Sequence, residues 1–153
     1  MKKVSLGREE LKALSAALRR VDFFADLSAR DLEHVFAVTS LYSFKSGHTV
    51  FRKGAVGDAL YMIHKGEVDI LLPRILLPSR RVARLGSGDV FGEMALIEQS
   101  LRTATAVTRG ETQLFVILKP HFDDIVESNP DFAYALKKVA SKRAFEVKDR
   151  FGA

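Results

Sequence analysis

The apolar positions near the start of the chain recur every three or four residues, which is the spacing of one face of a helix. They are Leu11, Leu14 and Leu18. Ser5 is available as the cap of this helix, and 28-SARDLEHVFAV-38 predicts a second helix opened by Ser28. The apolar face of the second helix consists of Leu32, Val35 and Phe36. Residues 5–40 are therefore expected to be helical.

The pattern changes to short β-rich runs between residues 40 and 118. Clear examples are 60-LYMIHKG-66, 67-EVDILL-72 and 113-QLFVIL-118. Glycines separate the runs at positions 47, 54, 57, 66, 86, 88 and 92. Short strands punctuated in this way predict a compact antiparallel barrel or sandwich.

Residues 119–151 return to a helical pattern. Pro120 can occupy a first helical turn, whereas Asn129-Pro130 interrupts the pattern before 131-DFAYALKKVASKRAFEVKDRF-151. The order helix, barrel, helix predicts an α+β fold, most simply one domain over residues 1–153.

One stretch of the β part departs from the strand pattern. The run 70-ILLPRILLPSRR-81 repeats Ile-Leu-Leu-Pro, and its two prolines cannot serve a central strand. It predicts a long hairpin loop with a partly covered apolar face. The alternative is a docking loop for a partner, since an exposed apolar patch can mark an interface.

Composition agrees with one globular domain, because 47% of the 153 residues are hydrophobic and 28% are charged. The sequence contains no cysteine, which excludes disulfides and thiolate chemistry. Its basic start lacks the apolar segment of a signal peptide, and no run approaches the roughly 18–20 apolar residues that cross a bilayer. A cytoplasmic protein is expected. The formal charge of +5 favours phosphate-bearing partners only weakly, because basic surface is usually just solvated.

The stretch 91-FGEMALIEQSLRTATAV-107 places two opposite charges, Glu93 and Arg102, in an otherwise apolar segment. Either they neutralise each other, or they face a ligand that carries hydroxyls and a negative charge. A cyclic nucleotide is such a ligand. Glu93 could accept a hydrogen bond from its ribose 2′-hydroxyl, and the planar fork of Arg102 suits phosphate oxygens.

Neighbouring residues suit the same ligand. Gly92 allows the backbone to approach it, and Ala95 keeps the wall of the site thin. Thr103 adds a hydroxyl donor beside the phosphate, and 93-EMALIEQ-99 is long enough for a short helix whose first N–H groups would face the anion.

These residues resemble the phosphate-binding cassette of the cyclic nucleotide-binding domain family. The match consists of Phe91-Gly92-Glu93-Met94-Ala95-Leu96 followed by Arg102-Thr103-Ala104, with the family's nine-residue step from glutamate to arginine. The resemblance implies an antiparallel β-roll, a jelly-roll barrel, with the cassette at residues 91–105. It also implies that Gly92, Met94 and Ala95 contribute through backbone and close packing, and that the ligand is cAMP or cGMP.

A second match lies upstream, in 50-VFRKGAVGDALYMIHKGEV-68. Its glycines, Gly57-Asp58 and the apolar quartet Leu60–Ile63 fall where the family turns its early strands. Phe51 replaces a smaller aliphatic residue of the family, which suggests an adjustment of the core.

The resemblance implies that the last helix closes over the purine as a lid and passes the signal on. The residues that share one face of this helix are Phe132, Leu136, Val139, Arg143 and Val147. Arg143 could stack on the purine, or it could be one more exposed basic residue of a basic helix.

Relatives of three kinds carry further parts that are not visible here: a helix-turn-helix module, membrane spans or an inhibitory segment. The expectation is a bare sensor domain without a DNA-binding module or a membrane span, either independent or a fragment, with an unidentified downstream protein and with a homodimer left open. Metal-dependent hydrolysis is not expected, because the histidines are scattered and Asp123-Asp124 suits the surface of an amphipathic helix. No catalytic or metal-binding residue is therefore predicted.

Two functions follow. The first is a regulatory domain that senses a cyclic nucleotide, preferably cAMP, and signals by movement of its C-terminal helix. The alternative is the same fold used as a protein-interaction domain, with an empty pocket or another effector, or with an internal Glu93–Arg102 ion pair and no ligand.

Overall fold

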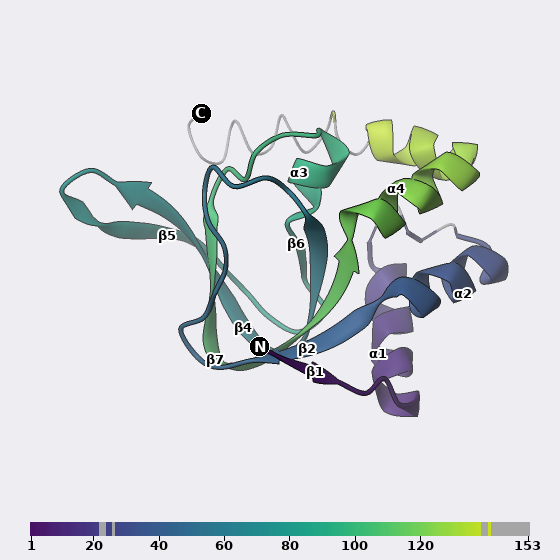
Figure 1. Cartoon of the computed structure of the whole chain (residues 1–153), viewed down its shortest axis with the longest axis horizontal. Coiled ribbons are helices and arrows are strands. Elements are labelled where there is room, and N and C mark those ends of the chain that lie inside the picture. Colours follow the sequence, from purple (N-terminus) through teal and green to yellow (C-terminus); the bar gives the residue numbers. More distant parts are fainter. Residues whose placement is uncertain (22–23, 26, 139–140, 142–153) are drawn as a thin grey trace.

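The computed structural model describes residues 1–21, 24–25, 27–138 and 141. Its strands curl into an antiparallel roll, and helices gather beside one end of that roll (Figure 1). The labelled helices are α1 (Arg8–Arg19), α2 (Ala29–Val38), α3 (Glu93–Ile97) and α4 (Lys119–Ser128). The strands are β1 (Lys2–Val4), β2 (Ser40–Phe44), β3 (Thr49–Phe51), β4 (Ala59–Arg74), β5 (Leu77–Leu85), β6 (Val90–Phe91) and β7 (Thr105–Leu118). The predicted α+β fold, a β-roll flanked by helices, is confirmed.

Two long strands organise the roll. The sheet has the order β1-β2-β7-β4-β5, and β3 pairs with β7 while β6 pairs with β4. Strands β4 and β7 pair from Ala59 opposite Leu118 to Leu71 opposite Thr105. The short strand β6 pairs with β4 through Tyr61 opposite Phe91. The loop of the upstream motif ends where β4 begins. The predicted cassette begins where β6 ends, and it ends where β7 begins.

The apolar quartet of β4 is buried on both faces. Because successive side chains of a strand point to opposite faces, the quartet divides between two cores. Leu60 and Met62 join the core beneath the helices, whereas Tyr61 and Ile63 join the core inside the roll. The strand is therefore continuously apolar in sequence, and it connects the helical layer to the interior of the roll.

Helix boundaries agree with the sequence in two of three cases. The side chain of Ser28 caps α2 by accepting a hydrogen bond of 3.2 Å from the Asp31 N–H, as predicted. Pro120 lies in the first turn of α4, as predicted. The predicted cap of the first helix is wrong, because Gly7, and not Ser5, occupies that position without a side-chain hydrogen bond. Residues 2–4 form β1, which the sequence pattern did not predict.

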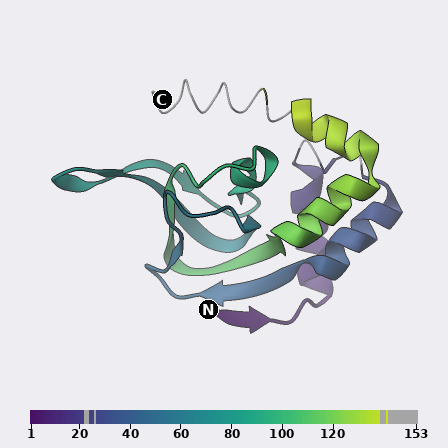
Figure 2. The same cartoon turned by 45° about the horizontal axis from the view of Figure 1, so that its top comes forward.

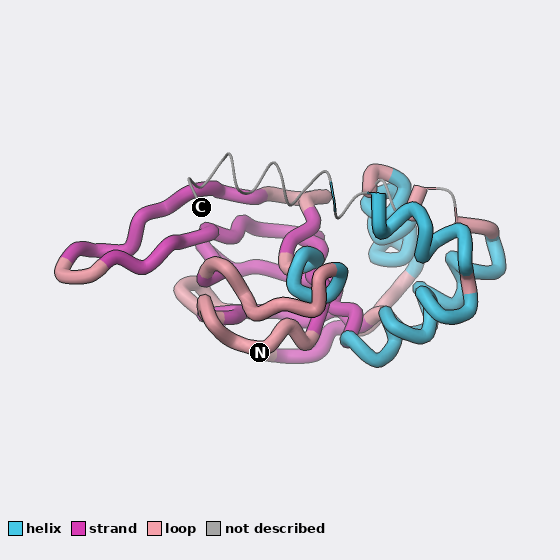
Figure 3. Tube along the Cα trace, turned by 90° about the horizontal axis from the view of Figure 1, so that it is seen from above, coloured by secondary structure: helices cyan, strands magenta, loops and turns pink. Residues whose placement is uncertain are grey.

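The expected long hairpin loop is also wrong. Strands β4 and β5 continue through the Ile-Leu-Leu-Pro repeat, and Arg74 pairs with Leu77 so that only Ile75 and Leu76 connect them. Pro78 is tolerated because β5 is the last strand of the sheet, and Pro73 because it lies beyond Leu71, where the pairing of β4 with β7 ends. The hairpin extends away from the rest of the molecule, on the side opposite the helices (Figures 1 and 3).

Residues 130–138 form a helix that follows α4 after a turn at Asn129 (Figure 2). Phe132 is buried in this helix and stacks on Phe24 with ring centroids 5.4 Å apart. It also meets the edge of Phe122 of α4 at 6.2 Å. Leu136 is buried as expected, while Val139, Arg143 and Val147 lie outside the described residues.

We expect Phe132→Ala to lower the free energy of unfolding by about 3–5 kcal/mol, because it removes a buried aromatic ring and leaves a cavity. Tyr134→Ala is the matched control on the same helix, since Tyr134 is 64% exposed. It should lower the free energy of unfolding by less than about 1 kcal/mol. Urea denaturation measures both variants. Equal losses would show that Phe132 does not anchor this helix.

Candidate ligand-binding site

Gly92 connects β6 to the short helix α3 in a conformation that favours glycine. Its φ angle is 81°, in the left-handed region. A Cβ atom here would lie 2.8 Å from Nη1 of Arg102 and 3.2 Å from the Phe51 ring. Glycine is thus needed both for the turn and for the close approach of the Arg102 side chain.

The Arg102 side chain is buried, and backbone carbonyls hold its two terminal nitrogens. The residue is 3% exposed. Nη1 donates to the Gly92 carbonyl at 2.5 Å, and Nη2 donates to the Ala59 carbonyl at 2.7 Å. Nη2 also lies 3.4 Å from a carboxylate oxygen of Asp58, whose side chain is 75% exposed. These contacts orient the guanidinium, but the carbonyls bring no charge to balance it.

Aromatic rings cover the face of the same guanidinium. Its central carbon lies 4.1 Å from the ring centroid of Phe51 and 5.9 Å from that of Tyr61. The remaining Nε–H is buried and has no hydrogen-bond acceptor among the described residues. Burial lowers the pKa of the Arg102 guanidinium, while the charges of Tyr61, Asp58 and Glu93 act in the opposite direction.

The upstream motif and the cassette meet at Arg102. The backbone N–H of Arg102 donates to the Ala55 carbonyl, and the Gly54 N–H donates to the Arg102 carbonyl, both at 2.8 Å. A Cβ atom at Gly57 would lie 2.5 Å from that of Ala95, so the two loops touch there as well. The segments 54–57 and 95–102, far apart in the sequence, thus form one wall.

The structure brings most of the predicted site residues to this wall. Glu93 is 8% exposed and is the first residue of α3. Met94 is half-buried, Ala95 is buried against Gly57, and Thr103 is exposed beside Arg102. Arg143 lies outside the described residues, so its predicted contact with a purine stays a prediction.

Two contributors to the site were missed by the sequence analysis. The sequence predicts only an adjustment of the core at Phe51, but its half-buried ring stacks on the Arg102 guanidinium. The sequence places Asp58 in a turn motif and predicts no contact with Arg102, yet its carboxylate lies 3.4 Å from Nη2 of Arg102. An aspartate directly before a buried strand could have signalled the second role, whereas nothing in the sequence pattern relates Phe51 to Arg102.

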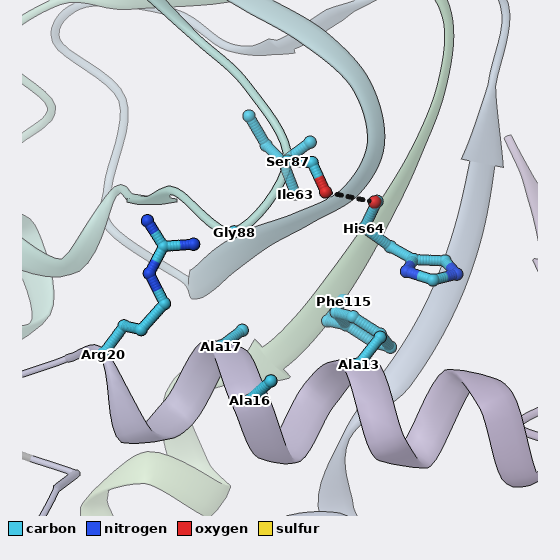
Figure 4. A pocket seen from close by; sticks show the side chains of 9 residues that line it. All are labelled: Ala13, Ala16, Ala17, Arg20, Ile63, His64, Ser87, Gly88 and Phe115. Atoms are coloured by element: carbon cyan, nitrogen blue, oxygen red, sulfur yellow. Dashed lines mark hydrogen bonds between the residues drawn. The ribbon is translucent and has the colours of Figure 1, made fainter.

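A separate hollow lies between α1 and β4 (Figure 4). Its volume is about 190 Å³, below the roughly 300 Å³ at which ligand pockets usually begin. Three of its nine lining residues are alanines, and the Ser87 hydroxyl already has a partner, since it donates to the His64 carbonyl at 2.8 Å. Burial lowers the pKa of His64. The wall around Arg102 is therefore the stronger candidate.

Within the described ranges, no three or more His, Asp or Glu side chains come together as a metal ion would require. The same part of the chain contains no helix with the length and apolarity needed to cross a bilayer.

A family model, the cyclic nucleotide-binding domain, matches residues 41–129, more than half of the chain. The chain therefore belongs to the cyclic nucleotide-binding domain family, as its resemblance to that family implied. Domains of this family are regulatory and are typically not catalytic.

Relatives of several kinds share this domain. The cyclic AMP receptor protein of Thermus thermophilus is 26% identical over 124 residues, which are 81% of this chain and 57% of that protein. A cyclic nucleotide-gated potassium channel of Rhizobium etli is 34% identical over 98 residues, or 64% of this chain and 26% of the channel. The regulatory domain of Toxoplasma gondii PKA, solved with cAMP, superimposes with a TM-score of 0.74 at 25% identity, covering 94% of this chain and 51% of that one. The chain thus spans less than two thirds of each.

We expect Gly92→Ala to destabilise the protein more than Gly47→Ala does. Both glycines have left-handed φ angles, 81° and 78°, so the backbone strain of the two variants is similar. Only at Gly92 would the new methyl group meet the Arg102 side chain, since nothing lies within 4 Å at Gly47. Overpacking of this kind costs about 1–3 kcal/mol.

Urea denaturation of both variants measures the difference in the free energy of unfolding. Equal values would show that the Arg102 guanidinium does not lie against Gly92.

Proposed function

We propose that this domain is a sensor that binds a purine 3′,5′-cyclic monophosphate, preferably cAMP, at Arg102, and that it does not turn the nucleotide over. The observation that carries this proposal is the buried Arg102 guanidinium, whose Nε–H has no acceptor within the part of the chain that the structure describes. A buried donor without a partner typically costs about 1–3 kcal/mol, so an anion that supplies the acceptor would bind with a corresponding gain.

The geometry of the guanidinium suits a phosphate. Its N–H groups donate in the plane of the group, while its faces stack on aromatic rings. Phe51 covers a face, so the stack and a phosphate at the Nε edge are compatible. We infer that Phe51 and the two carbonyls hold the guanidinium in advance, which reduces the entropy lost on binding.

Two further residues would contact the other parts of the ligand. Glu93 begins α3 near Arg102, and we propose that it accepts a hydrogen bond from the ribose 2′-hydroxyl. Thr103 is exposed beside Arg102, where its hydroxyl can donate to the phosphate or to a purine. A threonine permits both cAMP and cGMP. The cAMP in the solved Toxoplasma gondii domain supports cAMP as the first ligand to test.

The alternative function, a protein-interaction domain with an empty pocket, has one observation in its favour. Ile75 and Leu76 at the hairpin tip are 90% and 99% exposed. Titration distinguishes the two functions, since only the sensor binds a cyclic nucleotide.

We expect calorimetric titration with cAMP and cGMP to show one site, with cAMP binding at least as well as cGMP and without formation of the 5′-monophosphate. Arg102→Ala should weaken cAMP binding by about 30-fold to several-thousand-fold, since removing one partner of a buried charge pair costs about 2–5 kcal/mol. Glu93→Ala should lose less, because a charged–neutral hydrogen bond contributes about 1.5–3 kcal/mol.

Two further variants keep this test specific. Arg102→Lys retains the charge but loses the planar fork, so it should also bind weakly. Arg109→Ala removes an exposed arginine of β7 and should bind like the wild type. An unchanged dissociation constant for Arg102→Ala would contradict the proposed site.

We further propose that the helix beginning at residue 130 carries the signal. Phe132 and Leu136 are buried and anchor the first turns of this helix, whereas Lys137 and Lys138 are exposed, so little apolar surface fixes its end to the domain. A purine stacked beneath this helix, with Arg143 as the cation, would add a cation–π contact of about 0.5–2 kcal/mol. That energy would change the ratio of closed to open helix by a few-fold to tens-fold.

We expect saturating cAMP to slow amide hydrogen exchange across residues 132–147, because the ligand would favour the closed position of this helix. Deletion of the residues after Leu136 should weaken cAMP binding without abolishing it, since Glu93 and Arg102 remain. Arg102→Ala is the control, and at the same cAMP concentration it should show no slowing. The same exchange with and without ligand in the wild type would rule out the lid.

A further inference from the structure

The tip of the β4–β5 hairpin exposes its apolar side chains fully. Ile75, Leu76 and Leu77 are 90%, 99% and 59% exposed. They stand at the far end of a hairpin that projects from the body of the molecule (Figures 1 and 3). Water contact of three neighbouring aliphatic side chains is unfavourable, so the tip is suited to burial in something outside the chain.

The backbone of the tip is strained in a way that presents leucine at the apex. Leu76 has a φ angle of 61°, in the left-handed region that glycine or asparagine adopts at little cost. A glycine at the second of the two connecting positions would make the same turn without strain, because Leu76 has a positive φ angle and Ile75 does not. Backbone strain at an exposed apolar residue indicates that its side chain has a function.

The charge of the tip is of one sign. Arg74, Arg80 and Arg81 are exposed around the apolar residues, and no acidic residue lies between positions 70 and 83. The nearest acidic residue on β4, Asp69, pairs with Arg84 at 2.8 Å and so offers little charge to the tip. The surface that receives the tip must therefore be apolar inside and anionic at its edge.

We propose that this hairpin tip docks the domain onto an anionic phospholipid bilayer. Strand residues are spaced about 3.3 Å apart, so Arg80 lies roughly 13 Å along β5 from Leu76. Interfacial segments bury apolar groups about 5–10 Å into the boundary between headgroups and acyl chains. With Ile75 and Leu76 at that depth, the arginines lie at the level of the lipid phosphates.

The polar groups of the tip also favour lipid over a protein strand. Pro73 and Pro78 have no N–H to donate, and the Pro78 carbonyl accepts a hydrogen bond of 2.9 Å from Nε of Arg74. A protein partner that added a strand to β5 would lack these ladder bonds at the tip. A bilayer core offers no hydrogen-bond partners to the backbone. A segment that enters it must therefore have few unpaired backbone N–H and C=O groups.

The test is co-sedimentation of the full chain with vesicles. We expect the wild type to bind vesicles of equal parts phosphatidylcholine and phosphatidylglycerol, and not vesicles of phosphatidylcholine alone. Binding should fall as the salt concentration rises towards about 1 M, where the screening length is about 3 Å. A wild-type chain that stays in the supernatant with the mixed vesicles would overturn the proposal.

Two double variants separate the apolar and the charged contributions. Ile75→Asn with Leu76→Gly removes the apolar apex and places glycine at the positive φ angle of position 76, so it should fold at least as well and bind at least about tenfold more weakly. Arg80→Gln with Arg81→Gln should weaken binding about 30-fold, because each arginine near an anionic surface contributes about a factor of five.

The matched control is Arg8→Gln with Lys12→Gln, which removes the same charge from exposed positions on α1. It should bind the mixed vesicles as the wild type does. If the control loses as much binding as the variant at Arg80 and Arg81, the binding depends on the net charge of the protein and not on the tip, and the proposal is overturned. A tip variant that binds vesicles normally, or that only changes the oligomeric state in light scattering, would also overturn it and assign the tip to a protein surface or a second copy.

Discussion

A buried guanidinium needs acceptors for its N–H groups, and the loops around Arg102 are arranged by that requirement. The Gly92 and Ala59 carbonyls can reach it only because β6 ends, and β4 begins, beside the cassette. Gly92 must lack a Cβ to admit the side chain. Phe51 then closes the face of the guanidinium. One charged group thus determines the turn, the neighbouring strand ends and the aromatic contact.

The same strands link this site to the helices. Successive residues of β4 alternate between two cores, so Tyr61 lies near Arg102 while Leu60 and Met62 pack beneath the helical layer. Phe132 joins that layer through its stack on Phe24. A shift of β4 at the site would therefore change the surface on which the C-terminal helix rests, because close-packed protein interiors transmit such shifts.

Sequence reasoning predicted those parts of the fold that depend on local pattern. The Ser28 cap and the Asn129-Pro130 break each depend on residues a few positions apart, and both are found. The three-residue strand β1 is too short to show a period, and the prolines of the hairpin suggested a loop because their edge position is a property of the whole sheet. For the candidate site, the spacing of Glu93 and Arg102 predicted the cassette. The stack of Phe51 on Arg102 could not be predicted, because it joins segments that meet only in three dimensions.

Three positions break local rules. Leu76 and Gln99 have positive φ angles, and the buried Nε–H of Arg102 lacks an acceptor among the described residues. Gln99 and Arg102 belong to the cassette, and Leu76 stands at the hairpin apex. Natural sequences keep such violations mainly where they serve a function, with the cost offset elsewhere in the fold. The cost at Arg102 would be recovered by a phosphate, and the cost at Leu76 by an apolar medium. Leu76 and Arg102 thus lie in connections outside the long strands β4 and β7, and those strands supply the stability that permits both costs.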